Sequence, residues 1–339
     1  MNRRTFSLGA IALLAAFFSA CSANRELPMT TLAPKSDLSD WIYRLFIEVT
    51  LWDTLILIIV IVAFILAVFF FSTRVGEAAP PKSAASDLGL EIAWTIGPAL
   101  VILMISIPTV RTIFRSQPRI PPEGALRIKV TAHQWWWEFQ YGESGVTTAN
   151  ELHIPTGRAI YLDLMSSDVI HSFWVPQLGG KRDVVPGQIN ELTFVAQIPG
   201  VYPGQCAEFC GDSHANMRFR AIVESPEQFA QWTAQQQAAP LPADRITDAS
   251  AANGAKVFAN SPCGTCHRIE GVTKGYIGPD LTHFAGRTTM AGGIMPNTPE
   301  NVAQWITDPQ TLKPGALMPP LGLRGQQLND LVAYLESLK

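Results

Sequence analysis

Charged residues are scarce in this chain. Asp, Glu, Lys and Arg make up 16% of its 339 residues, whereas typical soluble domains contain roughly a quarter. Hydrophobic residues reach 47%. This combination predicts segments that lie inside a membrane. The formal net charge is −3, so the basic surface that nucleic-acid binding requires is not expected.

Cysteine is also rare, and its spacing argues against a disulfide framework. The count is odd, with one isolated cysteine and two close pairs. Such a pattern indicates one residue with its own role and two pairs that bind or attach a group. The five cysteines are Cys21, Cys206, Cys210, Cys263 and Cys266.

The N-terminal residues have the features of a targeting segment. Arg3 and Arg4 precede an apolar run at 11–18, which is shorter than the roughly 20 residues that span a bilayer. Small residues then lead to Cys21, as at a bacterial lipoprotein cleavage site. We therefore expect residues 1–21 to be a signal peptide of lipoprotein type. The alternative is an ordinary signal peptide with an incidental cysteine.

Two long apolar runs follow, at 49–71 and 92–113. Each is long enough to cross a hydrocarbon core of about 30 Å. Trp41, Tyr43 and Trp52 lie near one end, and such aromatic residues suit the membrane interface. The runs predict a transmembrane helix hairpin over 40–115. Buried helices of a soluble protein, the alternative, are rarely apolar on all sides over this length.

Residues 122–225 have the pattern of a β domain. Apolar and polar residues alternate at 127–131, 159–165, 192–197 and 220–223, and Gly/Pro turns separate these segments. Short, regularly spaced strands predict a β-sandwich or a barrel. Residues 233–247 are rich in Gln, Ala and Pro, which predicts a linker over 226–248. Helical patterns return in 249–339, at 249–259, 299–307 and 326–338.

The β domain contains a cluster of soft metal ligands. Cys206, Cys210, His214 and Met217 fall within twelve residues, and His171 lies 35 residues before Cys206. Thiolate, thioether and imidazole suit copper. Two thiolates can bridge two copper ions, each capped by one histidine, with the methionine and a backbone carbonyl at weak axial positions. A Cys206–Cys210 disulfide and a Cys₂His₂ zinc site are the alternatives, although methionine is a poor zinc ligand.

At these residues the chain resembles a known family over about residues 40–225. The β domain is similar to the dinuclear copper A domain of cytochrome oxidase subunit II. This resemblance implies a cupredoxin-like β-sandwich. The matching runs are 133–137, 168–176, 181–187 and 204–211, together with 91–98 at the start of the second apolar run.

The resemblance also implies roles for individual residues. The implied copper ligands are His171, Cys206, Cys210, His214 and Met217. Glu208 would offer a backbone carbonyl to copper, and its carboxylate would reach a magnesium ion at the border with subunit I. Trp135 would be the aromatic residue that first receives electrons, unless it is a packed surface tryptophan. Glu91 would lie at the mouth of a proton channel, unless it is a solvated helix-end carboxylate.

A second motif, Cys263-Gly-Thr-Cys266-His267, is the signature of c-type haem attachment. On its own it also occurs in zinc and redox sites. The run 278–281 and the loop 313–320, which contains Met318, resemble class I cytochromes c. This resemblance implies an all-α cytochrome c domain over 249–339, thioether bonds from both cysteines to one haem, and His267 and Met318 as axial ligands. It also implies a hydrogen bond from His267 to the Pro279 carbonyl. Competing axial ligands are Met290, Met295 and His283.

Together the resemblances imply a multidomain membrane protein that carries electrons into a haem–copper terminal oxidase, a cytochrome-c oxidase. Electrons would pass from a donor through haem c and copper A to the oxygen-reducing site of subunit I, coupled to proton translocation by the complex. No catalytic residue is expected in this chain. Implied partners are subunit I, subunit III, the lipid bilayer, and a donor that is either a cytochrome or a membrane complex.

The export signal and covalent haem place both soluble domains on the outer face of a bacterial plasma membrane. The positive-inside rule does not support this orientation. The hairpin loop holds only Arg74 and Lys82, whereas the opposite flank holds Arg111, Arg115 and Arg119. Rival functions are a nitric or nitrous oxide reductase subunit, a quinol-oxidase subunit II without copper, and a copper chaperone.

Overall fold

The computed structural model describes residues 27–71, 87–117, 120–240, 242 and 245–339. The predicted signal peptide with Cys21, and most of the predicted hairpin loop, lie outside this part of the chain. The described residues form two compact units, one within 40–117 and the other combining those of 27–39 and 120–339. They are described separately.

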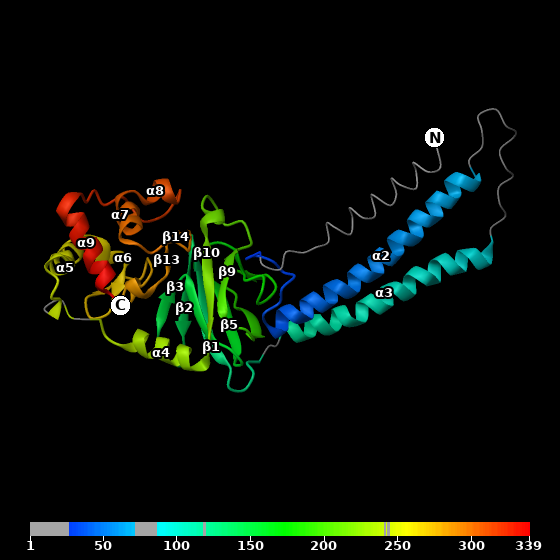
Figure 1. Cartoon of the computed structure of the whole chain (residues 1–339), viewed down its shortest axis with the longest axis horizontal. Helices are drawn as coiled ribbons and strands as arrows, with labels where there is room; N and C mark the ends of the chain where they lie inside the picture. The colour runs from blue at the N-terminus through cyan, green and yellow to red at the C-terminus, as the bar shows by residue number, and fades with distance from the viewer. Residues whose placement is uncertain (1–26, 72–86, 118–119, 241, 243–244) are drawn as a thin grey trace, which may run out of the picture. The chain divides into compact units, whose positions relative to one another are not determined.

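The smaller unit contains two long helices, α2 (Asp37–Phe71) and α3 (Leu88–Ser116) (Figure 1). Both are long and apolar enough to cross a membrane. Asp87 caps α3 by accepting hydrogen bonds from the amides of Gly89 and Leu90. The hydroxyls of Thr50 and Thr95 donate to the carbonyls four residues earlier, so their polar groups are satisfied within the helix, as an apolar medium requires. The predicted hairpin helices are confirmed.

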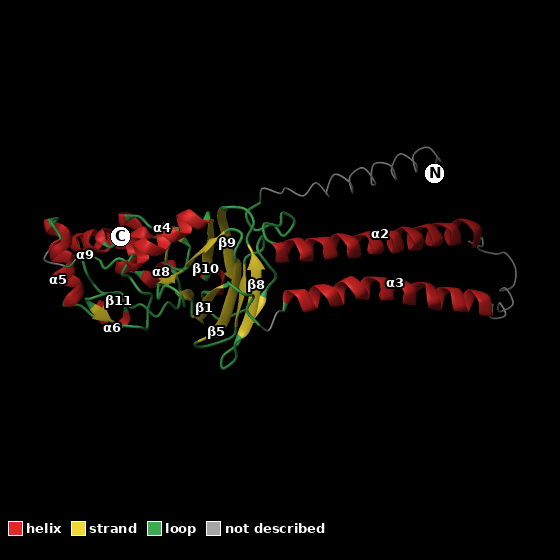
Figure 2. Ribbon diagram, turned by 90° about the horizontal axis from the view of Figure 1, so that it is seen from below, coloured by secondary structure: helices red, strands yellow, loops and turns green. Residues whose placement is uncertain are grey.

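The larger unit begins with a sandwich of two five-stranded sheets (Figure 2). The first has the order β3-β2-β1-β5-β8 and the second β4-β10-β9-β6-β7. The strands of the first sheet are β1 (Leu126–His133), β2 (Trp136–Tyr141), β3 (Thr147–Ala149), β5 (Ala159–Ser166) and β8 (Asn190–Val195). Those of the second are β4 (Glu151–Pro155), β6 (His171–Trp174), β7 (Arg182–Val184), β9 (Gly200–Cys206) and β10 (Arg218–Glu224).

Alternation along the strands builds the core between the sheets. In β1 every second residue is buried, which is the period expected of a strand with one face inward. Trp137 packs edge-on against Phe173 and is tilted against Phe219, so an aromatic core joins β2, β6 and β10. In the second sheet β6 pairs with β9, which places Phe173 opposite Cys206. Strand pairing therefore brings ligand candidates that are distant in the sequence to one end of these two inner strands.

The predicted linker, 226–248, begins with a regular helix, α4 (Pro226–Gln237). Ser225 and Gln228 form a capping box, with Pro226 in the first turn, which is a strong start signal. Phe229 and Trp232, three residues apart, pack on Tyr141 of the sandwich. The Gln/Ala-rich composition obscured these two apolar residues. The prediction of a linker is therefore wrong for 226–237, where the chain forms a helix.

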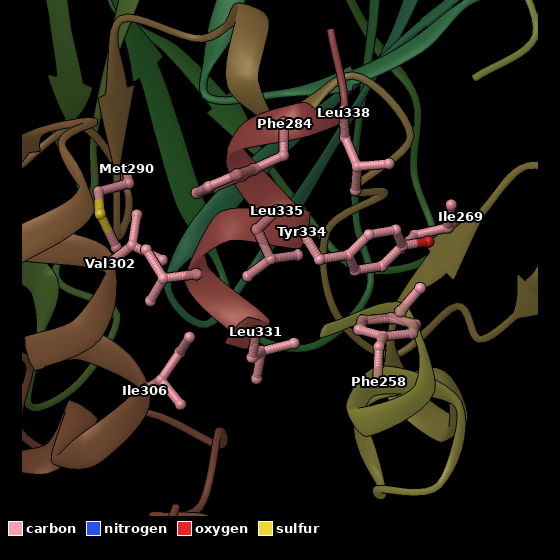
Figure 3. Packing of buried hydrophobic residues seen from close by; sticks show 12 residues of the cluster. Phe258, Ile269, Phe284, Met290, Val302, Ile306, Leu331, Tyr334, Leu335 and Leu338 are labelled. Atoms are coloured by element: carbon pink, nitrogen blue, oxygen red, sulfur yellow. The ribbon is translucent and has the colours of Figure 1, made fainter. Parts of the chain in front are cut away.

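The C-terminal domain is a small helical fold. Its elements are α5 (Ala249–Ala259), α6 (Cys263–Cys266), β11 (Arg268–Ile269), β12 (Thr273–Lys274), η3 (Phe284–Gly286), β13 (Thr289–Met290), β14 (Met295–Pro296), α7 (Pro299–Thr307), α8 (Pro309–Leu312) and α9 (Gly325–Ser337). Helices α5 and α9 pack together through Phe258 and Tyr334 (Figure 3). The three predicted helices are confirmed, the last within one residue at each end.

Candidate copper and haem sites

Five donor atoms meet at one end of β6 and β9, two inner strands of the second sheet. His171 begins β6, Cys206 ends β9, and the following loop with the short helix η1 (His214–Asn216) supplies Cys210, His214 and Met217. The Cys206 and Cys210 Sγ atoms lie 3.8 Å apart. His171 Nδ1 lies 3.8 Å from Cys206 Sγ, and His214 Nδ1 lies 3.5 Å from Cys210 Sγ. Each sulfur of the pair thus has one imidazole beside it.

The remaining donors complete the set. Met217 Sδ lies 3.9 Å from Cys210 Sγ, and the Glu208 carbonyl oxygen lies 3.3 Å from Cys206 Sγ. A disulfide would need sulfurs roughly 2.05 Å apart, and both cysteines are free. Zinc uses four ligands, fewer than the donors gathered here. The set of two thiols, two imidazoles, a thioether and a carbonyl, with His171, both cysteines and Met217 buried, fits a copper pair.

A hydrogen bond between the two cysteine sulfurs favours the thiolate form of Cys206. It lowers the pKa of Cys206, and His171 adds to this effect against the opposing influence of burial. The same hydrogen bond raises the pKa of Cys210. The thiolate is the form that binds metal, so the lowered pKa favours metal binding at Cys206.

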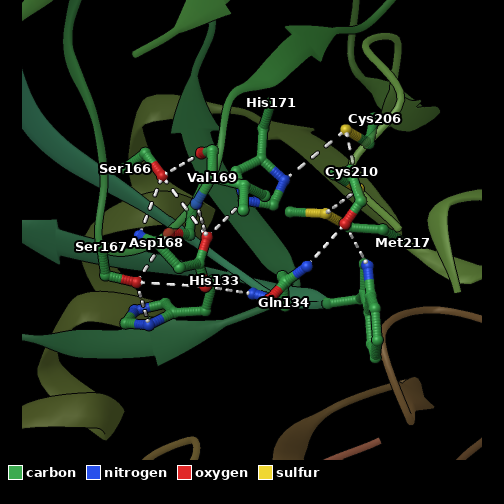
Figure 4. A network of polar contacts seen from close by, with 12 residues as sticks. His133, Gln134, Ser166, Ser167, Asp168, Val169, His171, Cys206, Cys210 and Met217 are labelled. Carbon is green, nitrogen blue, oxygen red and sulfur yellow. Dashed lines mark hydrogen bonds and ion pairs between the residues drawn. The ribbon is translucent and has the colours of Figure 1, made fainter. Parts of the chain in front are cut away.

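A carboxylate fixes the orientation of His171. Asp168 Oδ1 lies 2.7 Å from His171 Nε2, which leaves Nδ1 facing the sulfurs (Figure 4). Burial lowers the pKa of His171, but the hydrogen bonds with Asp168 and Cys206 outweigh it and the net pKa is raised. Asp168 is itself held by the amides of Gln134 and Val169, each at 2.6 Å. Asp168 is thus an outer-shell residue that sets the tautomer of a candidate ligand.

The variant Asp168→Ala is expected to lower copper affinity by about 10–100-fold, the usual cost of losing an outer-shell carboxylate. The measurement is a copper titration of the metal-free full-length chain against a competing chelator. Asp168→Asn keeps an acceptor oxygen and should recover part of the affinity. Asp163→Ala, which removes a β5 carboxylate that accepts a hydrogen bond from Arg127 on β1, is the matched control. Equal affinities for Asp168→Ala and the control would contradict the role of Asp168.

The C-terminal domain encloses an apolar cavity around the Cys-x-x-Cys-His motif. The single turn α6 holds Cys263 and Cys266, and the His267 amide donates to the Cys263 carbonyl at 2.8 Å. His267 Nδ1 lies 2.8 Å from the Pro279 carbonyl oxygen, which confirms the expected hydrogen bond. Burial lowers the pKa of His267, so its imidazole stays neutral. The apolar lining includes Phe258, Leu281, Phe284, Leu331 and Leu335.

Among the candidates for the second axial ligand, Met318 and Met290 line this cavity. Met290 is packed into the hydrophobic core of the domain. His283 Nδ1 lies 2.9 Å from the Lys339 carbonyl oxygen, and neither His283 nor Met295 is among the residues found to line the cavity in the described part of the chain. Both cysteines, a neutral imidazole and a thioether therefore face one apolar space, which suits a covalently held haem.

The β-sandwich also contributes to this cavity. Gln134, Trp135 and Trp136 form part of its wall. The Trp135 indole donates a 2.9 Å hydrogen bond to the Cys210 carbonyl, and Gln134 Nε2 donates to the same oxygen at 2.7 Å. Trp135 thus touches both sites. Sequence reasoning had singled out Trp135 but missed Gln134, whose only signal was its place in the aromatic run.

The other predicted residues have less specific surroundings. The Glu208 side chain is exposed, while its carbonyl faces Cys206. Glu91 lies in the first turn of α3.

Three family models match the chain. They are cytochrome c oxidase subunit II, transmembrane domain, at 36–112; cytochrome c oxidase subunit II, periplasmic domain, at 144–225; and cytochrome c at 251–339. Their order reproduces the hairpin, the sandwich and the C-terminal helical domain.

Curated relatives match over almost the whole length. Cytochrome c oxidase subunit 2 of Alkalihalophilus pseudofirmus is 36% identical over 334 residues, with 97% of this chain and 96% of the relative covered. The Bacillus subtilis protein of the same name is 33% identical, with 92% of each chain covered. Quinol oxidase subunit 2 of Bacillus cereus is 32% identical over 62% of this chain and 75% of the relative. The chain therefore belongs to the cytochrome c oxidase subunit 2 family and carries a cytochrome c domain at its C-terminal end.

Proposed function

We propose that this subunit receives electrons at its cytochrome c domain and passes them through the copper site to subunit I. There the complex reduces oxygen and translocates protons. The observation that carries the proposal is Trp135, which lies in the wall of the cavity around His267 and bonds to the Cys210 carbonyl at 2.9 Å. One aromatic side chain thus connects the two sites.

The donor sets assign the groups to be held. His171, Cys206, Cys210, His214 and Met217, with the Glu208 carbonyl, would hold two copper ions. Cys263 and Cys266 would bond one haem covalently, with His267 and Met318 as its axial ligands. When bound, these groups supply one-electron redox chemistry without an open position for substrate. The chain itself orients them and excludes water from their surroundings.

Further features of the proposal rest on the family resemblance. The Glu208 carboxylate would bind magnesium at the border with subunit I, and Glu91 would lie at the mouth of a proton channel there. Subunit III and a donor cytochrome or membrane complex would complete the assembly. Residues 1–21 would direct export to the outer face of a bacterial plasma membrane and, through Cys21, lipid attachment.

The variant Trp135→Leu is expected to slow electron transfer from haem to copper by roughly an order of magnitude or more, because it removes both the aromatic ring and the hydrogen bond to the Cys210 carbonyl. Trp135→Phe, which keeps a ring, should be affected less. In the purified complex, a laser pulse activates a ruthenium reductant that reduces the haem. The absorbance changes of the haem and the copper site then report the rate of electron transfer between them.

Trp232→Phe, which alters a tryptophan stacked on His153, is the control. Optical and EPR spectra verify that haem and copper are present in every variant. An unchanged transfer rate in Trp135→Leu would refute the route. Turnover with nitric or nitrous oxide in place of oxygen would refute the assignment of the reaction.

A further inference from the structure

A carboxyl group of the β-sandwich is buried against the cytochrome c domain. Glu151, on β4, is 1% exposed. Its Oε1 accepts hydrogen bonds from the amide and the hydroxyl of Thr288, at 2.9 and 2.5 Å, and from the amide and the hydroxyl of Thr289, at 2.9 and 3.0 Å. Burying a carboxyl group is costly unless it is hydrogen-bonded. Here two consecutive residues of the other domain supply these hydrogen bonds, and the Arg287 guanidinium of that domain interacts electrostatically with Glu151.

A lysine makes the reciprocal contact. Lys313 belongs to the cytochrome c domain and is 4% exposed. Its Nζ donates to the Trp135 carbonyl at 2.5 Å and to the Ala291 carbonyl at 3.0 Å. Burial lowers the pKa of Lys313 to about 7, a measure of how fully the amine is withdrawn from water. Lys313 therefore links the backbone of the electron-carrying tryptophan to the other domain.

The backbone between these two contacts also fits closely. Gly315 has φ of +77°, and a Cβ there would lie 2.8 Å from Trp135 Cη2. A Cβ at Gly292, where φ is +82°, would lie 2.3 Å from Lys313 Nζ. The Ser213 hydroxyl donates to the Pro314 carbonyl at 2.6 Å, and the Arg218 amide donates to the Gly292 carbonyl at 2.9 Å. These close backbone contacts differ from the hydrated contacts, made mainly by side chains, of a transient protein–protein complex.

We propose that Glu151 and Lys313 are positioning residues that lock the cytochrome c domain onto the β-sandwich, with the loop 313–318 pressed against Trp135. This inference rests on the proposed function. The locked domain covers Trp135, which is 8% exposed. An external donor therefore reduces the haem at another edge of the cytochrome c domain, and its electrons reach copper only through the attached domain.

The test uses the double variant Glu151→Ala/Lys313→Met in the purified oxidase complex. Loss of these buried hydrogen bonds is expected to lower the equilibrium constant for docking by about tenfold or more, and internal haem-to-copper transfer should slow as the undocked fraction grows. A soluble reduced class I cytochrome c, added as probe, should gain a direct route to copper. The control Glu123→Ala/Lys274→Met replaces an exposed residue of the same type in each domain and should behave as the unmodified protein.

Optical and EPR spectra must show haem and copper intact in the double variant, and Glu151→Gln, which keeps an acceptor oxygen, should restore part of the transfer rate. Hydrogen exchange on the unmodified complex provides a readout that needs no variant. The amides of Thr288, Thr289 and Arg218 donate across the interface and should be strongly protected.

Rapid exchange at these amides, or wild-type transfer rates in a fully loaded double variant, would overturn the lock. Neither result would affect the proposed function, which fails instead if the unmodified protein transfers no electron from haem to copper.

Discussion

Replacing Cys206 and Cys210 together with serine is expected to abolish copper binding and to reduce donor-driven oxygen consumption to the background of membranes without the oxidase. The two thiols lie 3.8 Å apart at the centre of the donor cluster, with an imidazole beside each. Serine offers only a hydroxyl oxygen, a hard ligand that does not replace a thiolate at a soft copper site. Metal analysis and EPR of the purified complex should show the loss of the mixed-valence copper signal.

In the same variant the haem spectrum should remain that of a low-spin cytochrome, because the haem motif lies in a separate helical domain. This retained spectrum is the internal control for folding and export. A variant that keeps both copper ions and normal turnover would disprove the assignment of these thiols.

Replacing Cys263 and Cys266 together with alanine is expected to remove the haem and leave the copper. Covalent haem should disappear, donor-driven turnover should again be lost, and the cytochrome c domain should lose its stable fold. The reason is the apolar cavity between α6 and α9, lined by residues such as Phe258 and Leu335, because a hollow core destabilises a domain in proportion to its volume. Haem staining after denaturing electrophoresis and protease sensitivity of residues 249–339 provide the measurements.

The copper EPR signal should survive in this second variant, because the sandwich has its own aromatic core around Trp137 and Phe173. Ser261→Ala, which removes a hydroxyl within 3.0 Å of Cys263 Sγ but neither thiol, is the matched control and should retain haem. Covalent haem in the double variant would contradict thioether attachment at these positions.

Both sites could be predicted from the sequence because they use rare residue types at short spacing. Cys206 to Met217 and Cys263 to His267 are each almost continuous in the chain, so local geometry gathers most of their donors. Helices α5 and α7 were predictable for a similar reason. Each begins at a side-chain cap, Asp248 or Thr298, and such start signals are local.

Strands near the sites were harder to predict. β9 contains Pro203 and Gly204, residues that argue against a strand, yet it pairs with both β10 and β6. Tertiary pairing here overrides the local preference. Local pattern alone was therefore insufficient at the strand that ends in Cys206.

The lock between the domains was beyond sequence reasoning. Glutamate usually lies at the protein surface, so nothing in the local sequence indicates that Glu151 is buried. Its hydrogen-bond partners Thr288 and Thr289 lie 137 and 138 residues further along the chain. The burial of Lys313 likewise depends on Trp135, 178 residues away. No local periodicity encodes contacts over such separations, so only the assembled fold reveals them.

Because α4 packs on the sandwich, only part of the segment 226–248 separates the two soluble domains. The twelve residues of this helix are fixed on the sandwich by Phe229 and Trp232, which leaves eleven residues, 238–248, before α5 begins. Eleven residues reach roughly 36–40 Å when fully extended. A cytochrome c domain released from the sandwich would thus remain at a high local concentration near its binding surface, so a soluble cytochrome competes with it only at a concentration above that local value.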